Sequence, residues 1–447
     1  MLNKVLIANR GEIAVRVIRA CRELGISTVA VYSDADVEAL HVRHADEAVH
    51  LGPPPANKSY LRTDALLEAA RGTGADAVHP GYGFLAENAA FAGACRESGL
   101  AFVGPAPEAI EKMGDKSAAR ALAREAGVPM VPGTEGGVTE AEAVSAAREI
   151  GYPLMIKAAA GGGGRGIRVA ESEEELKQSV RVARQEAEAA FGDGSLYLER
   201  FLAAPRHVEV QVLGDHHGNV VHLFERECSM QRRRQKVLEE APSPGMAPHT
   251  RERMLESAVR LAERADYTNA GTVEFLVDTA GEFYFIEMNT RIQVEHPVTE
   301  MLTGVDLVKS QLRIASGEPL PIRQEDVAMD GWAMEFRINA EDPDNGFIPS
   351  PGEISALEVP GGPGVRVDSA VYGGYSIPPF YDSLIGKLVI WGLTREEAVD
   401  RARRALREYR IEGISTTIPL HLRLLEEEPF ATGGYDTSYL EKLLENT

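Results

Sequence analysis

Hydrophobic runs alternate with segments of helical periodicity near the start of the chain. The apolar runs lie at residues 4–8, 28–32, 75–79 and 100–103, and residues 12–24 have the spacing of an amphipathic helix. Gly/Pro turns such as "HPGYG" stop the runs. This alternation predicts a parallel, doubly wound sheet through about residue 113. The turn after the first run, "NRGE", lacks the G-x-G-x-x-G fingerprint, which argues against a nicotinamide-dependent oxidoreductase.

A second group of elements predicts a small α+β unit at about residues 130–203. Its strands are expected at residues 153–157, 167–170 and 195–200. Its helices are opened by "TEAE" and "SEEE", in which a hydroxyl residue is followed three positions later by glutamate, as in a capping box. We expect this unit to move as a body.

The complete pattern predicts three domains in a mixed fold, in which an α/β section is followed by α+β sections. We place them at residues 1–113, 114–330 and 331–447, with the small unit as a lid inside the second. The last section holds strand patterns from Trp332 onward and a helix opened by "TREE" at 394–397.

Four consecutive glycines at 161–164 lie between two predicted strands, shortly after Lys157. A P-loop would instead run from a strand into a helix and end in Gly-Lys-Ser/Thr. Backbone amides of a glycine run can approach phosphates closely, and Lys157 would point toward them. The alternative is a mobile linker, but the nearby lysine and the acidic strand pair described next favour phosphate binding.

Two strand patterns, "GTVEFLVD" and "EFYFIEMN", are separated by Thr-Ala-Gly. If the turn centres on Ala280–Gly281, Glu274 faces Glu287 across an antiparallel ladder. Two carboxylates ~5 Å apart repel by roughly 3 kcal/mol at an effective dielectric of about 20, so we expect a compensating cation. Asn289 adds a neutral oxygen, and oxygen ligands suit Mg²⁺ or Mn²⁺. A surface strand with solvated acids is the alternative, and the apolar "FYFI" argues against it.

Polar residues occupy every second position in the stretch "IEMNTRIQVEHPVTE". In an extended chain their side chains would share one face: Glu287, Asn289, Arg291, Gln293 and Glu295. The fork of an arginine suits a carboxylate or bicarbonate, and Glu295 is placed to act as a general base. A structural salt bridge between Arg291 and Glu295 is an equally open interpretation.

Other charged residues are ambiguous when taken singly. Lys116 stands at an expected helix start, where a lone lysine is usually solvated, and His207 would more often be a satisfied core histidine. Arg337 alternates with apolar residues in "MEFRIN", so it projects from the polar face of a strand toward a ligand or a salt-bridge partner. The basic run "QRRRQK" lies among acidic residues and lacks aromatics, which favours a small anion site over nucleic acid.

Composition narrows the classes of function. The 447 residues are 44% hydrophobic and 26% charged, as in ordinary globular proteins. The net charge of −21 argues against a nucleic-acid or anionic-membrane partner, because both need a basic surface. Three scattered cysteines give no disulfide framework. The sequence has neither a run of about eighteen apolar residues nor a signal-peptide pattern, so we expect a cytoplasmic protein.

Motifs along essentially the whole chain match one known family. They are, in order, "IANRGEIAVRVIRA", "HPGYGFLAEN", "GDK", "GGGGRG", "PRHVEVQVL", "ERECSMQRR", "GTVEFL", "IEMNTRIQVEHPVTE", "RINAEDP" and "YDSLIGK". The chain resembles biotin carboxylase, the ATP-grasp subunit of acetyl-CoA carboxylase and its relatives. The resemblance implies a Rossmann-like N-terminal domain, an ATP-grasp domain with a mobile lid and a mixed α+β C-terminal domain. It also implies that ATP and bicarbonate form carboxyphosphate, whose carboxyl group then passes to biotin.

The resemblance implies roles for residues at the matching positions. For ATP these are Lys116, Lys157, Gly163, Gly164, Glu199, Arg200, Phe201, Leu202, His207, Arg234, Glu274 and Glu287. For two Mg²⁺ or Mn²⁺ ions they are Glu274, Glu287 and Asn289. For bicarbonate they are Lys236, Arg291, Gln293, Val294 and Glu295. Lys236, Arg291 and Glu295 would be catalytic, together with Arg337, which would stabilise an oxyanion of biotin near Tyr82.

The resemblance also implies partners. Because no carrier-like domain follows Thr447, we expect biotin to arrive on a separate biotin carboxyl carrier protein. We also expect a homodimer that works with a carboxyltransferase subunit. The reaction would be the first half-reaction of acetyl-CoA carboxylase in fatty acid synthesis, or alternatively that of a propionyl-CoA or pyruvate carboxylase. Two positions depart from the family: Arg234 replaces a usual histidine, and Ala160 replaces a frequent glycine.

Two further hypotheses are disfavoured by the residues present. One is a ligase that acts on another carboxylate or on ammonia, and the other is a non-catalytic, nucleotide-sensing subunit. Both are at odds with a complete set of the family's catalytic groups, namely Lys236, Arg291, Glu295 and Arg337.

Overall fold

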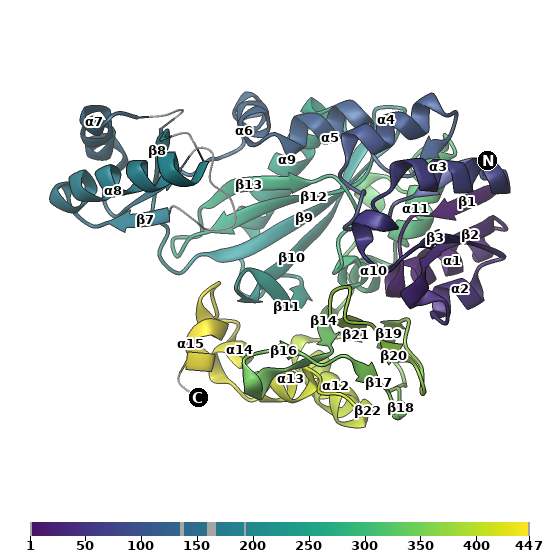
Figure 1. Cartoon of the computed structure of the whole chain (residues 1–447). Coiled ribbons are helices and arrows are strands. Elements are labelled where there is room, and N and C mark those ends of the chain that lie inside the picture. The colour runs from purple at the N-terminus through teal and green to yellow at the C-terminus, as the bar shows by residue number, and fades with distance from the viewer. Residues whose placement is uncertain (1, 135–137, 159–166, 192–193, 446–447) are drawn as a thin grey trace. The chain divides into compact units, whose positions relative to one another are not determined.

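The computed structural model describes residues 2–134, 138–158, 167–191 and 194–445 (Figure 1). It divides into two compact units. The first comprises Met1–Val128, Arg206–Val277 and Ile286–Thr447, and the second comprises Pro129–Pro205 and Asp278–Phe285. Each unit is described by itself.

The N-terminal part of the first unit is a parallel sheet with the strand order β3-β2-β1-β4-β5, which confirms the predicted doubly wound pattern. Its strands are β1 (Lys4–Ile7), β2 (Ser27–Ser33), β3 (Glu47–Gly52), β4 (Ala77–His79) and β5 (Ala101–Phe102). Its helices are α1 (Gly11–Glu23), α2 (Leu40–His44), α3 (Thr63–Thr73), α4 (Ala89–Glu97), α5 (Pro107–Gly114) and α6 (Lys116–Glu125).

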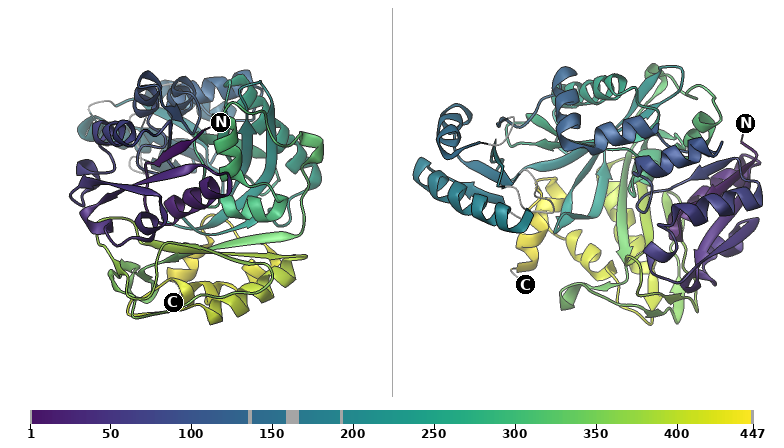
Figure 2. Two further views of the ribbon diagram at one scale, coloured as in Figure 1. Left: turned by 90° about the vertical axis from the view of Figure 1, so that its right-hand side faces the viewer. Right: turned by 45° about the horizontal axis from the view of Figure 1, so that its top comes forward.

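Helices cover both faces of this sheet because successive side chains of a strand point in opposite directions. Val5 and Ile7 of β1 pack with residues of α1 and of α11 (Leu307–Ala315). The intervening Leu6 packs on the other side, in a cluster that contains residues of α3 and α4. Figure 2 shows helices on both sides of these purple strands.

A larger, mostly antiparallel sheet forms the centre of the first unit, with the order β13-β12-β9-β10-β11-β14-β21-β19. Its strands are β9 (Arg206–Gly214), β10 (Val220–Arg232), β11 (Gln235–Ala241), β12 (Asn269–Val277), β13 (Phe283–Asn289), β14 (Trp332–Asn339), β19 (Val365–Ser369) and β21 (Leu384–Gly392). The helices α9 (Pro248–Arg264) and α10 (His296–Thr303) both contact β10.

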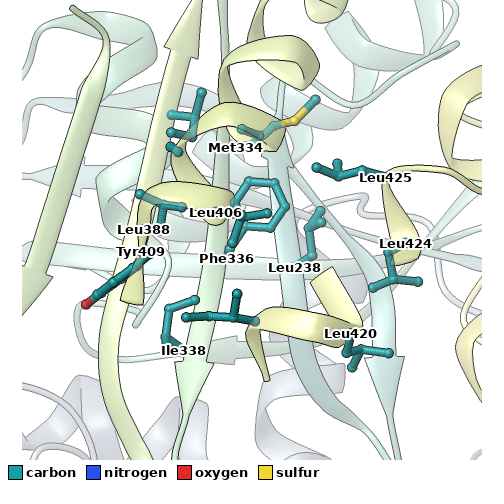
Figure 3. Packing of buried hydrophobic residues seen from close by; sticks show 14 of the residues in the cluster. Leu238, Met334, Phe336, Ile338, Leu388, Leu406, Tyr409, Leu420, Leu424 and Leu425 are labelled. Carbon is teal, nitrogen blue, oxygen red and sulfur yellow. The ribbon is translucent and has the colours of Figure 1, made fainter. Parts of the chain in front are cut away.

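The end of the chain packs on the β11–β14–β21 side of the sheet. Its helices are α12 (Arg395–Glu408), α13 (Ile418–Leu424), α14 (Glu428–Thr432) and α15 (Tyr439–Glu445). Short ribbons pair β15 (Glu341–Asp342) with β16 (Ile348–Pro349), β17 (Gly352–Glu353) with β20 (Ser376–Ile377), and β18 (Ala356–Glu358) with β22 (Arg410–Glu412). Figure 3 shows Phe336 of β14 among Leu238, Leu388 and Leu406, which lie on β11, β21 and α12.

The second unit is a small α+β body, as predicted. Its sheet has the order β7-β6-β8, with β6 (Leu154–Ala158), β7 (Ile167–Ala170) and β8 (Leu196–Arg200), and its helices are α7 (Glu140–Ile150) and α8 (Glu173–Phe191). Thr139 and Glu142 form the predicted capping box at the start of α7. Leu154, Ile156, Leu176 and Leu198 bury their side chains in its core.

Among the described residues, no helix has both the length and the apolar character that crossing a bilayer would require.

The buried position of Phe336 generates a prediction about stability. Its side chain is fully buried, so Phe336→Ala should leave a cavity and lower the free energy of unfolding by about 3–5 kcal/mol. Urea unfolding followed by circular dichroism measures the change. Phe380, which is 53% exposed, supplies the matched control, and Phe380→Ala should shift the same quantity by less than about 0.5 kcal/mol. Equal effects of the two substitutions would contradict the packing described.

Candidate active site

The register of the large sheet brings charged side chains together on neighbouring strands. Glu274 of β12 lies directly opposite Glu209 of β9, and Glu209 lies opposite Arg226 of β10 on its other side. Residues that face one another across a ladder have Cβ atoms roughly 5 Å apart on the same face of the sheet. The sheet itself therefore places two acids and a cation in one row.

Lys236 of β11 reaches into this row from the side. Its Nζ lies 2.6 Å from Glu209 Oε2, 2.5 Å from Glu295 Oε1 and 3.5 Å from Glu274 Oε1. Burial alone would lower the pKa of Lys236, but the surrounding acids raise it well above its usual value. Lys236 is thus a permanent cation that three carboxylates share.

Glu295 is bound by a second cation, Arg337 of β14. The Nη2 atom of Arg337 donates to Glu295 Oε2 at 3.0 Å, and its Nε donates to Glu239 Oε1 at 2.7 Å. Burial would raise the pKa of Glu295, but Lys236 and Arg337 outweigh burial and hold that pKa well below its usual value. A buried carboxylate that stays ionised can accept a proton, as a general base must.

Arg226, the cation in this row, holds Glu209 in place. This guanidinium is fully buried, and its Nε donates to Glu209 Oε1 at 2.6 Å. Its other nitrogens donate to Gln211, Thr272 and Thr299 at 2.7, 3.1 and 2.9 Å. Charge-assisted bonds of this kind fix the side chains that face the site.

The stretch from Glu287 to Glu295 differs from the extended strand predicted for it. Strand β13 ends at Asn289, and the chain then turns and enters α10 at His296, so one continuous polar strand face was a wrong interpretation. The turn nevertheless gathers the same residues. Gln293 donates to Glu274 at 3.1 Å, and Arg291 donates to Gln293 and Asn289 at 2.8 and 3.1 Å.

Glu87 fixes the orientation of this turn. One of its oxygens accepts from the amide of Thr290, and the other accepts from Nε of Arg291, each at 2.9 Å. Arg291 is therefore bound by Glu87, and the structure shows no salt bridge from it to Glu295 within the described residues, so that alternative interpretation is wrong.

The hairpin before the turn also corrects the predicted register. The amide of Asp278 donates to the carbonyl of Glu282 at 2.9 Å, which centres the loop on Ala280 and makes it one residue longer than predicted. Gly281 has a φ of 82°, the left-handed conformation that such three-residue loops require. Turn geometry by itself therefore does not place Glu274 directly opposite Glu287.

The proposed metal ligands still lie within electrostatic range of one another. Asn289 Nδ2 lies 2.8 Å from Glu274 Oε1. Partial desolvation and the charge of Glu274 both raise the pKa of Glu287. Burial opposes ionisation of Glu274, but Lys236 and His207 hold its pKa well below the usual value. Carboxylate and amide oxygens of this kind fit Mg²⁺ or Mn²⁺.

His207 extends the same cluster. Its Nε2 lies 3.0 Å from Glu274 Oε2, and the potential ligand atoms of His207, Glu209 and Glu274 all fall within 4.8 Å of one another. Burial would lower the pKa of His207, but Glu274 reverses the effect and raises it. His207 is accordingly a partner of an active-site acid and not an isolated core histidine.

The other residues predicted to bind nucleotide lie on α6, in the β10–β11 turn and in the second unit, and Lys116 lies within electrostatic range of Glu287. Lys116 is the exposed first residue of α6, and Arg234 is exposed in the β10–β11 turn with a φ of 67°. In the second unit, Lys157 of β6 pairs with Glu199 of β8, and Arg200, Phe201 and Leu202 follow. Gly163, Gly164 and Ala160 lie outside the described residues.

Tyr82 lines a separate cavity of about 210 Å³. Its hydroxyl donates to Glu12, and the cavity is also lined by Phe84, Tyr381 and Asp382. Arg337 is not among the residues that line this cavity.

Comparison with known proteins identifies the family. Residues 1–110 match the family model of the biotin carboxylase N-terminal domain, and residues 335–442 match that of the biotin carboxylase C-terminal domain. Between them, residues 115–323 match the ATP-binding domain of the carbamoyl-phosphate synthase L chain.

The chain belongs to the biotin carboxylase family. Biotin carboxylase 1 of Bacillus subtilis is 58% identical over 99% of this chain and 98% of that protein. A pyruvate carboxylase subunit of Methanothermobacter thermautotrophicus is 55% identical over 99% of this chain and 90% of that protein.

Solved structures give the same result. The biotin carboxylase domain dimer of Hydrogenobacter thermophilus 2-oxoglutarate carboxylase, in complex with MgADP, ADP and bicarbonate, is 52% identical to this chain. The match covers 99% of this chain and 98% of that chain, with a TM-score of 0.89. The predicted fold class and the predicted ATP-dependent ligase are confirmed, whereas the exact domain boundaries stay predictions.

This biotin carboxylase homologue contains acids in its centre that the sequence interpretation missed. Glu239 of β11 and Glu335 of β14 lie directly opposite one another, and both are fully buried. Neither oxygen of Glu335 meets a hydrogen-bond donor within the part of the chain that the structure describes. Burial raises the pKa of Glu239 from 4.5 to about 7 despite its bond to Arg337, and burial also raises that of Glu335 well above its usual value.

The shifted pKa of Glu239 predicts a pH dependence of stability. Between pH 4.5 and about 7 the folded protein keeps a proton that the unfolded chain has released, so stability falls as pH rises. Glu239→Gln should remove up to ~1.4 kcal/mol per pH unit of this slope, which urea midpoints at several pH values would measure.

The exposed Glu256 of α9 supplies the control for this prediction. Glu256→Gln should leave the slope as it is, and Glu335 adds a slope of the same sign that both variants keep. Superimposable pH profiles of Glu239→Gln and the wild-type protein would contradict the assignment.

Proposed function

We propose that this chain uses ATP and bicarbonate to carboxylate biotin held on a carrier protein, through carboxyphosphate. One observation carries the proposal: Glu295 is buried yet ionised between Lys236 and Arg337, beside a turn that presents Arg291. Cations next to an ionised carboxylate provide both an anion site and a base, which are the two requirements for activating bicarbonate. Membership of the biotin carboxylase family supports the same reaction.

Nucleotide binding would use the residues at the positions that match the family. The proposed contacts are Lys116, Lys157, the backbone of Gly163 and Gly164, Glu199 to Leu202, His207, Arg234, Glu274 and Glu287. Glu274, Glu287 and Asn289 would hold two Mg²⁺ or Mn²⁺ ions, which neutralise phosphate charge when bound. The raised pKa of Glu287 beside Glu274 indicates repulsion that a cation would relieve.

Bicarbonate would be held by Lys236, Arg291, Gln293 and Val294, with Glu295 as the base. The two cations lie on different elements, β11 and the turn after β13, so an anion between them would be bound from two directions. The negative charge of bound bicarbonate would raise the proton affinity of the Glu295 carboxylate. Glu295 would thereby become a stronger base when the substrate is present.

Carboxyl transfer would take place beside Arg337. The ureido nitrogen of biotin is too weak an acid for ordinary side chains, so phosphate released from carboxyphosphate would remove its proton. Arg337 would stabilise the negative charge that develops on the ureido oxygen. Tyr82 would lie at the biotin pocket, in keeping with its place on the wall of the 210 Å³ cavity.

The partners belong to the same proposal. We expect a biotin carboxyl carrier protein, a carboxyltransferase subunit, a homodimer and a cytoplasmic location. Acetyl-CoA is the proposed final acceptor, and propionyl-CoA or pyruvate is the alternative, because one relative is part of a pyruvate carboxylase. Mixing the protein with biotinylated carrier and each carboxyltransferase would identify the acceptor.

The proposed reaction predicts that ATP cleavage depends on bicarbonate and is stimulated by free biotin. Glu295→Gln cannot accept a proton, so it should lower bicarbonate-dependent phosphate release by about 10²–10⁴-fold. Binding of ADP, measured by calorimetry, should persist in this variant. The exposed Glu263 of α9 is the control, and Glu263→Gln should keep full activity. ATP turnover that is indifferent to bicarbonate and biotin would overturn the proposed function.

The proposed metal site predicts an altered metal requirement. Glu287→Gln removes one anionic ligand, so the Mn²⁺ concentration for half-maximal ATP cleavage should rise by at least about tenfold. Titration of activity with manganese chloride measures this change. The exposed Glu282 lies just before β13, and Glu282→Gln should leave the metal requirement unaltered. An unchanged metal requirement in both Glu287→Gln and Glu274→Gln would refute the ligand assignment.

A further inference from the structure

Lys387 is a buried cation that none of the roles above includes. It lies on β21, its side chain is fully buried, and it sits directly opposite Arg337 of β14 in the sheet. Opposite residues of neighbouring strands project from the same face, so Lys387 and Arg337 approach the centre of the molecule from the same side. Burying a lysine is costly unless its ammonium group is fully bound by partners.

One partner of Lys387 is the turn that carries the proposed base. Its Nζ donates to the backbone carbonyl of Val294 at 2.8 Å. The carbonyl of Val294 and the amide of Glu295 belong to one planar peptide unit. Lys387 thus fixes the orientation of this peptide at the point where Glu295 becomes the N-cap residue of α10.

The other partner is Glu12, the second residue of α1. Nζ of Lys387 lies 3.1 Å from Glu12 Oε1, and the same oxygen accepts the hydroxyl proton of Tyr82. Oε2 of Glu12 has no hydrogen-bond partner among the described residues. The position of Tyr82 therefore depends on an acid whose balancing cation is Lys387.

The contacts of Lys387 thus connect two proposed substrate sites. Val294 belongs to the bicarbonate set, and Tyr82 lines the cavity proposed for biotin. The ammonium group also lies 5.9 Å from the centroid of the Tyr82 ring. The other charged groups around Lys387 are Glu335, Asp368 and Arg366, and none of them forms a hydrogen bond or salt bridge with Val294 or Tyr82 within the described part of the chain.

We propose that Lys387 and Glu12 are positioning residues that hold the Val294–Glu295 peptide and the Tyr82 hydroxyl in a fixed relation, and so couple the bicarbonate and biotin sites. This inference rests on the proposed function. Neither residue touches the reacting atoms in this account. Their effect is to set the geometry of groups that do, and an error of about 1 Å in such geometry can cost on the order of 10²-fold in rate.

Steady-state kinetics of Lys387→Met test this proposal. The substitution keeps a long side chain but removes the donor, so the KM for bicarbonate and the KM for free biotin should each rise by at least about tenfold. The KM for ATP should stay within about twofold of the wild-type value. An equal rise in the KM values for bicarbonate, biotin and ATP would instead indicate general damage to the protein.

Lys4 provides a matched control because it makes the same two kinds of contact elsewhere in the first unit. Its Nζ donates to a glutamate, Glu47, at 2.7 Å and to the backbone carbonyl of Thr73 at 2.8 Å. Lys4→Met should leave all three KM values unchanged. A rise in the bicarbonate KM of Lys4→Met equal to that of Lys387→Met would overturn the positioning role.

A second variant guards against misfolding, because Lys387→Met leaves the charge of Glu12 buried and unpaired. The double variant Glu12→Gln with Lys387→Met removes both charges and should fold, with a melting temperature near that of the wild-type protein. It should still show the raised KM for bicarbonate and free biotin. Tyr82→Phe, which loses only the hydroxyl, should raise the biotin KM alone.

Two measurements distinguish failure of the positioning role of Lys387 and Glu12 from failure of the proposed function. Wild-type protein without bicarbonate-dependent ATP cleavage would defeat the proposed function. Wild-type protein with that activity, combined with unchanged bicarbonate and biotin KM values in the folded double variant, would defeat the inference alone.

Discussion

A buried carboxylate stays ionised only where cations balance its charge, and Glu295 is balanced by Lys236 and Arg337. Other charged side chains hold these two cations in place. Lys236 also binds Glu209, which Arg226 holds from the neighbouring strand, and Arg337 also binds Glu239. Removing one of these side chains would leave an uncompensated charge in a largely buried region. The site is therefore an electrostatic network in which the position of each side chain depends on its neighbours.

The backbone decides which charges can meet. Cross-strand pairing sets Glu274 beside Glu209, and Glu239 beside Glu335, regardless of what the side chains prefer. Like charges in such positions repel. Lys236 balances Glu209 and Glu274, whereas burial raises the pKa of Glu239 and of Glu335 and so favours their neutral forms. An anionic substrate bound at the proposed site would face cations that are already fixed, which would lower the reorganisation needed for binding.

Local patterns in the sequence predicted the elements of the fold well, because period-two and helical spacing reflect which side chains are buried. The alternation in β12 and β13 also led to Glu274, Glu287 and Asn289. The prediction of a continuous polar strand face was wrong after Asn289, because the chain leaves the strand there. A turn brings the same side chains together instead. Arg226, Glu239 and Glu335 were missed because partners on distant strands give them their roles, and one strand does not reveal its neighbours. The spacing of Glu209 two residues after His207 was a usable signal.

The pairing of β11 with β14 joins the ATP-binding part of the chain to its C-terminal part. Three domain models match successive parts of the chain, yet the middle and C-terminal parts share a single continuous sheet, and Arg337 lies on the C-terminal side of that junction. Cutting the chain there would expose an open strand edge of the type that drives aggregation. The C-terminal segment is thus no detachable module, and gene fusions that preserve activity must add new parts at the ends of the chain and not at this seam.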